Sequence, residues 1–331
     1  MLAGALVRLT GVISAVGRLI GIVCEATVAV PCANPCRSCP RPGAPPISIR
    51  LCVCAMSEPR LLVRADVPDL LELSRPAGWN QTAEDWLRLL ELSPLGSFGI
   101  VAGGRVVAST TAICYEKDLA WIGMVLTDPA HRGNGYASRL MQHALHWLNQ
   151  SGIAWIKLDA TDMGQPIYSK LGFENECELE RWKRPAASLP SRMSPVLPGK
   201  FEFDLQLDLE AFGARRRLLI ESLAREEAAS IPGSGYAMGR PGTVATYFGP
   251  CVARTVDTAR GLLEWFLSRH SHEDIFWDLF PGNASAASLA REYGFTPVRH
   301  LVRMAMRGAP VSAPLTHETA SVYAIAAFEY G

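Results

Sequence analysis

The strongest constraint on how this chain folds is a proline-rich segment at residues 185–200, which reads PAASLPSRMSPVLPGK. Four of its sixteen residues are prolines: Pro185, Pro190, Pro195 and Pro198. Proline lacks the backbone N–H that helix interiors and central strands require, so this segment can form neither. It is therefore predicted to be a linker, and the chain on either side of it has the length of an ordinary domain.

The first 56 residues differ in composition from the rest of the chain. They hold six of the nine cysteines and five arginines but a single acidic residue, Glu25. Arg18 and Glu25 interrupt the apolar stretch, which disfavours a membrane-spanning helix. We expect an extension without a fold, with Met56 as the working start. A targeting segment is the alternative, because a basic, acid-poor leader is typical of one.

Composition excludes several classes of protein. The chain has 331 residues, of which 49% are hydrophobic and 19% charged, so it is neither disordered nor fibrous. Its 32 basic and 32 acidic residues cancel, which leaves no basic field for nucleic acid. Three cysteines after the leader do not make a disulfide framework and favour a reducing compartment. We expect a cytoplasmic monomer or homodimer without stable membrane association, or an organellar protein if the leader is a transit peptide.

The cysteines of the leader raise the question of a metal. The spacing Cys32-x3-Cys36-x2-Cys39 can hold an iron–sulfur cluster. Enzymes that use this spacing need a large βα-barrel downstream, and no such repeat follows here. We therefore expect no metal.

Residues 57–184 alternate between helical and extended patterns. Asp66 and Thr82 are predicted to cap the first two helices. The predicted elements are helices at 67–73 and 83–92, strands at 99–102, 106–115 and 120–126, a helix at 136–149, a strand at 153–160, a short helix at 166–171 and a strand around 176–182. Strands and helices mixed over so short a span predict a layered α/β (α+β) fold.

The chemistry is concentrated at one strand-to-helix turn, Thr127–Ala137, which reads TDPAHRGNGYA. A helix start offers unpaired N–H groups and a partial positive charge. Gly133 and Gly135 allow a close approach of the backbone to a ligand, and Arg132 offers donors suited to phosphate oxygens. Together they predict a diphosphate-binding loop. It is not a Walker A loop, because no Gly-Lys-Ser/Thr follows, and it is not a dinucleotide fingerprint, because Ser138 stands where the third Gly or Ala should be. An ordinary turn with an exposed arginine is the alternative.

Two motifs resemble a known family. Arg-x-x-Gly-x-Ala at 132–137 resembles the acyl-CoA loop of GNAT-family N-acetyltransferases, and 167–173, IYSKLGF, is similar to the family's Tyr-x-x-x-Gly-Phe segment. The resemblance covers about residues 57–184. It implies a GNAT fold with a central mixed sheet, acetyl-CoA as co-substrate, and direct acetyl transfer to the primary amine of a small molecule or peptide. Residues 121–125 and 78–81 further resemble the tandem-GNAT group related to bacterial YitH-type proteins.

The resemblance also implies roles for particular residues. Tyr168 stands at the position of the family's general acid, although a packing tyrosine is the alternative reading. The Val125 amide is the candidate donor to the thioester carbonyl, and Trp79 and Asn80 are candidates for the acceptor pocket. The residues implied to hold the cofactor are Val125, Leu126, Thr127, Arg132, Gly133, Asn134, Gly135, Tyr136 and Ala137. The general base stays open among Glu116, Asp118 and Asp162.

Residues 201–331 look like a divergent copy of the first half. Glu292–Phe295 corresponds to Lys170–Phe173, and Arg303 and Arg181 both lie eight residues after the phenylalanine. Ala290 stands where Tyr168 would be.

Nor does the second half repeat the glycine turn. The segment 251–260 contains no glycine, so side chains would crowd a diphosphate. We predict a degenerate GNAT-like domain that does not bind CoA but covers the acceptor pocket, with a terminal strand at 321–328. The alternative for the whole chain is a non-catalytic acyl-CoA-binding or interaction module.

Overall fold

The computed structural model describes residues 58–187, 201–308 and 319–331. The leader with its cysteine triplet, Met56 and most of the predicted linker lie outside the described residues. Within these three ranges, no helix is long and apolar enough to cross a membrane.

All the elements predicted for the first half are present. After the short strand β1 (Arg60–Leu61) they are α1 (Val67–Ser74), α2 (Ala83–Leu92), β2 (Ser97–Ala102), β3 (Arg105–Tyr115), β4 (Leu119–Thr127), α3 (Tyr136–Gln150), β5 (Trp155–Ala160), α4 (Gln165–Lys170) and β6 (Glu174–Arg184). Thr82 caps α2 as predicted, accepting a hydrogen bond from the Asp85 N–H at 3.3 Å. The predicted Asp66 cap is wrong, because its carboxylate instead accepts from the Val63 N–H at 2.8 Å and pairs with Arg60.

The second half repeats this order of elements. They are α5 (Leu205–Phe212), α6 (Arg217–Leu223), β7 (Glu227–Ile231), β8 (Gly235–Arg240), β9 (Thr246–Ala253), α7 (Val256–His270), β10 (Ile275–Leu279), α8 (Ala284–Glu292), β11 (Thr296–Arg307) and β12 (Val322–Ala324). The predicted internal repeat is thus present as structure. The predicted terminal strand is present too, but it is shorter than residues 321–328.

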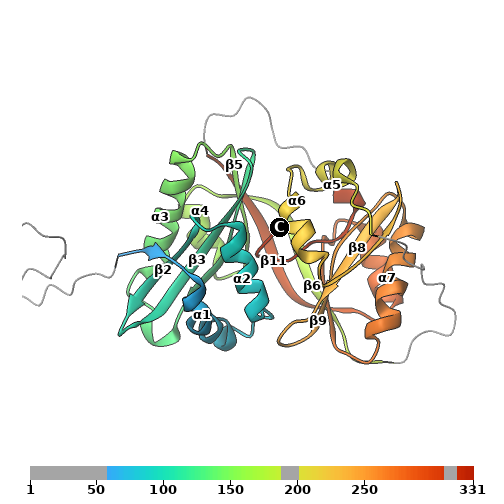
Figure 1. Ribbon diagram of the computed structural model, residues 1–331, viewed down its shortest axis with the longest axis horizontal. Coiled ribbons are helices and arrows are strands. Elements are labelled where there is room, and N and C mark those ends of the chain that lie inside the picture. Colours follow the sequence, from blue (N-terminus) through green and yellow to red (C-terminus); the bar gives the residue numbers. More distant parts are fainter. Residues whose placement is uncertain (1–57, 188–200, 309–318) are drawn as a thin grey trace, which may run out of the picture. The chain divides into compact units, whose positions relative to one another are not determined.

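The two halves build one mixed sheet in which their last long strands are exchanged. The order is β1-β2-β3-β4-β5-β11-β6-β10-β9-β8-β7, with β12 attached to β9. Strand β11 of the second half pairs with β5, and strand β6 of the first half pairs with β10. Figure 1 shows β6 and β11 at the centre, between the other strands of the two halves. The residues before and after the predicted linker therefore share one continuous sheet.

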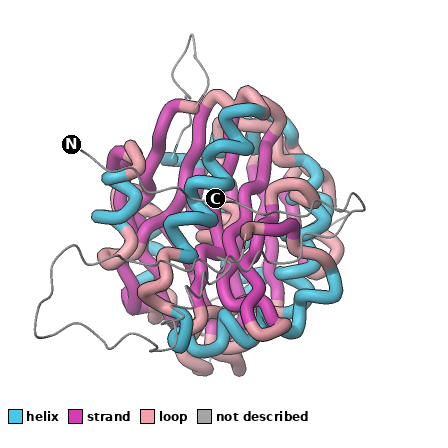
Figure 2. The backbone as a smooth tube through the Cα atoms, turned by 90° about the vertical axis from the view of Figure 1, so that its left-hand side faces the viewer, coloured by secondary structure: helices cyan, strands magenta, loops and turns pink. Residues whose placement is uncertain are grey.

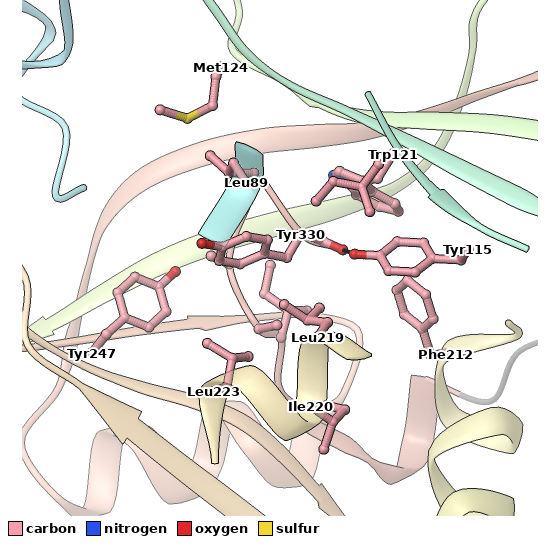
Figure 3. Close-up of a cluster of buried hydrophobic side chains, with 14 of the residues drawn as sticks. Leu89, Tyr115, Trp121, Met124, Phe212, Leu219, Ile220, Leu223, Tyr247 and Tyr330 are labelled. Carbon is pink, nitrogen blue, oxygen red and sulfur yellow. Dashed lines mark hydrogen bonds between the residues drawn. The ribbon is translucent and has the colours of Figure 1, made fainter. Parts of the chain in front are cut away.

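Helices flank the strands (Figure 2). The apolar residues of α3 that recur at helical spacing are buried against the sheet: Leu140, Met141, Ala144, Leu145 and Leu148. Another hydrophobic cluster contains residues of both halves, among them Leu89 and Trp121 of the first and Leu219 and Leu223 of the second (Figure 3). Because this core is shared, each half buries apolar surface of the other.

Candidate functional site

The site begins where two parallel strands separate. Strands β4 and β5 pair from Leu119↔Trp155 to Trp121↔Lys157, and there the pairing stops. Beyond that point β4 has a β-bulge, since Ser109 is the register partner of Leu126 but Thr111 is the partner of Gly123. Met124 lies in the bulge with φ 51°. The bulge turns the strand and leaves its last residues without a partner on the β5 side among the described strands.

The start of α3 is open to a ligand. Gly135 precedes the helix with φ 72°, and no side chain caps the helix. No acceptor among the described residues takes a hydrogen bond from the backbone amides of 133–138. A Cβ added at Gly133 or Gly135 would meet nothing within 4 Å, so this turn is not filled by side chains. Exposed Arg132 lies beside it. The arrangement can bind an anion such as a diphosphate.

Two neighbouring features support this use of the turn. Asp128 stabilises the backbone that leads into the turn, because its carboxylate accepts a hydrogen bond from the Ala130 N–H at 2.8 Å. This hydrogen bond lowers the pKa of the carboxyl group. At the end of β4, the Thr127 Oγ1 is buried and has no hydrogen-bond partner among the described residues. A buried hydroxyl is costly without a partner, so it suits a polar group entering the strand gap.

A cavity of about 110 Å³ lies at the inner end of the gap. Three residues predicted for the site line it together: Trp79, Val125 and Tyr168. The candidate bases Glu116, Asp118 and Asp162 do not line this cavity. The other lining residues are Gln81, Ile122, Gly123, Met124, Leu158, Asp159, Thr161, Arg181, Arg299, Leu301, Phe328 and Glu329.

Tyr168 is placed by α4, with its ring edge-on to Phe173 at 6.2 Å between centroids. Its hydroxyl makes no hydrogen bond to any residue that the structure describes. Burial raises the pKa of the phenol to about 12, because the phenolate would lose its hydration. The group therefore stays protonated at neutral pH and can donate its proton.

Asn80 lies outside the cavity. Its side-chain oxygen accepts from the Val244 and Ala245 N–H groups at 2.8 and 3.0 Å, and its Nδ2 donates to the Ala245 carbonyl at 2.9 Å. The amide thus holds the loop before α2 to the second half. Of the two predicted acceptor contacts, the structure brings only Trp79 to the cavity.

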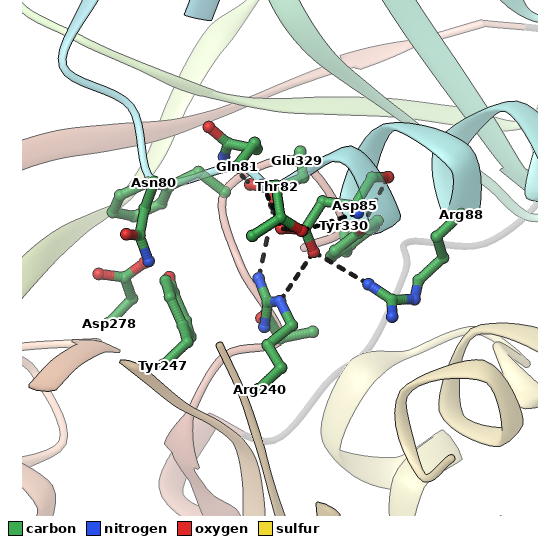
Figure 4. Close-up of polar contacts among 12 residues, drawn as sticks. Asn80, Gln81, Thr82, Asp85, Arg88, Arg240, Tyr247, Asp278, Glu329 and Tyr330 are labelled. Atoms are coloured by element: carbon green, nitrogen blue, oxygen red, sulfur yellow. Dashed lines mark hydrogen bonds and ion pairs between the residues drawn. The ribbon is translucent and has the colours of Figure 1, made fainter. Parts of the chain in front are cut away.

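Part of the cavity wall comes from the last residues of the chain, and these residues were not predicted from the sequence. The last residues of the chain reach into the first half: the Trp121 Nε1 donates to the Phe328 carbonyl at 2.8 Å, and the Tyr115 hydroxyl donates to the Tyr330 carbonyl at 2.6 Å. Glu329 between them accepts from Gln81 Nε2 at 3.0 Å (Figure 4). The sequence predicted that the second half covers the acceptor pocket but not which residues do so, because no motif or periodicity in the chain identifies these positions.

Glu329 occupies an unusual environment. Its side chain is 2% exposed, and Oε1 lies 3.5 Å from Arg240 Nη2 without a hydrogen bond. Arg240 is shared, since its Nε also donates to Asp85 at 3.0 Å. Burial raises the pKa of Glu329 to about 6.

Two equivalent ion pairs join each exchanged strand to its neighbour from the other half. Arg303 of β11 donates to Asp159 of β5 at 2.9 and 3.0 Å, and Arg181 of β6 donates to Asp278 of β10 at 2.8 Å twice. All four side chains are at most 7% exposed. Each arginine that the repeat aligned therefore bridges to the aspartate of the opposite half.

The corresponding gap in the second half is closed. Strands β9 and β10 also separate after three pairs, but β12 pairs with β9 there, and the Ile325 N–H donates to the Asp278 carbonyl at 3.0 Å. The Thr255 hydroxyl caps α7 by accepting from the Thr258 N–H at 3.2 Å. The chain itself therefore fills this gap in the second half, and the absence of a second CoA site stays a prediction.

Comparison with known proteins agrees with this geometry. Residues 65–173 match the model described as "Acetyltransferase (GNAT) family", and residues 205–323 match the model described as "Acetyltransferase (GNAT) domain". The chain belongs to the GNAT acetyltransferase family and contains two GNAT domains, and membership implies the use of acyl-CoA.

Among individual relatives, the chain is similar to YitH of Bacillus subtilis, an uncharacterized N-acetyltransferase. The two are 25% identical over 211 residues, which cover 60% of this chain and 73% of that protein. A crystal structure from Pyrococcus horikoshii, described as a candidate acetyltransferase, has a TM-score of 0.73 at 19% identity and covers 84% of this chain and 96% of its own. A tandem GNAT protein from the clavulanic acid biosynthesis pathway has a TM-score of 0.52 at 16% identity and covers 77% and 99%. Both structures share the fold.

Proposed function

We propose that the first half transfers an acetyl group from acetyl-CoA directly to the primary amine of a small molecule or peptide. The observation that carries this proposal is the open start of α3, with its free amides, next to a strand gap that leads to Tyr168. The second half serves as a non-catalytic wall, because its own gap is occupied by β12.

Three groups of this chain hold the cofactor in the proposal. The amides of 133–138 and Arg132 bind the diphosphate. The edge of β4 beyond Trp121 is unpaired on the β5 side among the described strands and includes Val125, Leu126 and Thr127. It pairs with the amide-bearing arm of the cofactor, which joins the diphosphate to the thioester. In this pose the thioester lies at the cavity that Val125 and Tyr168 both line.

The chemical step is a direct acyl transfer. The amine nitrogen attacks the thioester carbon, a C–N bond forms and the C–S bond breaks. The Val125 N–H stabilises the negative charge that develops on the carbonyl oxygen. Tyr168 gives its proton to the leaving sulfur, and the amine gives up its own proton to a base.

We assign the base to Glu329. It is one of two carboxyl groups on the cavity wall, and the other, Asp159, is bound by Arg303 through two hydrogen bonds. A pKa of about 6 leaves Glu329 ionised at neutral pH yet more basic than an ordinary carboxylate.

Release of free CoA thiol from acetyl-CoA with a panel of amines tests the activity, and thermal-shift stabilisation by acetyl-CoA tests binding separately. Gly135→Trp should abolish the stabilisation, because its side chain would occupy the diphosphate position. Tyr168→Phe should slow thiol release while acetyl-CoA still stabilises the protein. Binding without thiol release from any amine would favour the non-catalytic acyl-CoA-binding module instead.

A further inference from the structure

Two arginines lie directly opposite each other on the cavity wall. Arg299 of β11 is the register partner of Arg181 of β6, and both side chains line the same cavity. Like charges opposite each other on neighbouring antiparallel strands are destabilising. A pair of this kind is stabilised only if anions lie close to both charges.

Arg181 already has its anion in Asp278, through two hydrogen bonds of 2.8 Å. Arg299 makes no hydrogen bond or ion pair with any residue in the ranges 58–187, 201–308 and 319–331. Its pKa is lowered, because burial removes water from the guanidinium group and Arg181 repels the charge, and the attraction of Asp278, which is hydrogen-bonded to Arg181, offsets this only in part. Arg299 is therefore a half-buried cation that shares the field of Asp278 with Arg181 but has no hydrogen-bonded partner of its own among the described residues.

The acidic groups of the cavity do not supply this partner. Asp159 is bound by Arg303, and Glu329 lies against Gln81 and Arg240. Arg299 is thus the charged residue of the cavity wall that has no hydrogen-bonded or ion-paired partner among the described residues.

We propose that Arg299 binds a carboxylate of the acceptor, so that the substrate is a small amine that also carries a carboxylate, as an amino acid does. The planar guanidinium matches a carboxylate with two parallel hydrogen bonds. The cavity of about 110 Å³ has room for a carboxylate group beside Arg299. Since Tyr168 and Val125 line the same space, a carboxylate held by Arg299 orients the amine toward the thioester. This inference rests on the proposed acetyl transfer.

Matched probes test the proposal. Each pair has the same amine and differs in the carboxylate: glycine and glycinamide, β-alanine and β-alaninamide, γ-aminobutyrate and γ-aminobutyramide. The full chain is assayed for thiol release with acetyl-CoA, and the affinity of each probe is measured by calorimetry with CoA, which has no acetyl group to transfer. Arg299→Gln and Arg299→Lys are compared with Arg64→Gln, which removes an exposed arginine whose side chain is 72% exposed.

At least one acid should exceed its amide about ten- to a hundredfold in kcat/KM and in affinity, the range expected for a charge-assisted hydrogen bond. Arg299→Gln should remove this preference, Arg299→Lys should keep part of it, and Arg64→Gln should keep all of it. Equal binding of acids and amides, no binding of any acid, or a preference that survives Arg299→Gln would overturn the proposal. If an acid binds through Arg299 but no thiol is released, the acetyl-transfer proposal fails while the carboxylate site stands.

Discussion

Replacing Glu329 with glutamine should change the free energy of unfolding in a pH-dependent way. Relative to the native protein, the variant should be more stable at neutral pH than it is at acidic pH. The carboxyl group is buried, and burial raises its pKa from the ordinary 4.5 to about 6. Between these two values the folded state binds the proton and the unfolded state does not. The native protein therefore loses stability at this residue as the pH rises through that window, and a neutral glutamine does not.

The magnitude follows from the difference between the two pKa values. A rise of about 1.5 corresponds to about 2 kcal/mol at 25 °C. Glutamine has nearly the same shape and keeps an oxygen that can accept from Gln81, so packing in the cluster of Figure 4 is retained. Any constant effect of the substitution cancels when the variant is compared with the native protein at several pH values.

The assay is urea unfolding of the native protein and Glu329→Gln between pH 4 and pH 7.5. The difference in free energy of unfolding should move by about 2 kcal/mol in favour of the variant as the pH rises. Glu84→Gln, at an exposed position of α2, controls for the loss of one negative charge. A difference that stays constant, or that moves in favour of the native protein, would refute the reasoning. The same variant should be slower in the proposed acetyl transfer, since it lacks the carboxylate that we propose as the base.

Three further predictions concern other parts of the molecule. Arg303→Met leaves Asp159 buried without its cation and should lower the free energy of unfolding by about 3–5 kcal/mol in urea titrations; a loss below about 1 kcal/mol would contradict it. Thr255→Ala removes the hydroxyl that caps α7 and should lower it by about 1 kcal/mol, whereas an unchanged midpoint would show that the cap is not needed. Tyr168→Phe should reduce kcat about a hundredfold, and unchanged turnover would remove Tyr168 from the mechanism.

The local elements were predictable because their causes lie within a few residues. The stripe of α3 follows a helical period, and the same five residues are buried. The turn before it was identified by Gly133 and Gly135, whose positive φ angles require residues without a side chain. The Asp66 cap failed because a competing partner, Arg60, comes close only when the preceding chain folds back.

What the sequence alone determined is the set of local elements, the repeat that duplicates them, and the turn at 132–137, since periodicity, glycine and helix polarity act over short distances. Only the tertiary structure decided which strand of each repeat lies beside β5 or β10, because pairing with either copy satisfies the same backbone groups. That exchange joins Arg303 to Asp159 and brings Arg181 and Arg299 to the cavity wall, and the chain's last residues add Glu329. These contacts join residues more than a hundred positions apart, which no local pattern encodes.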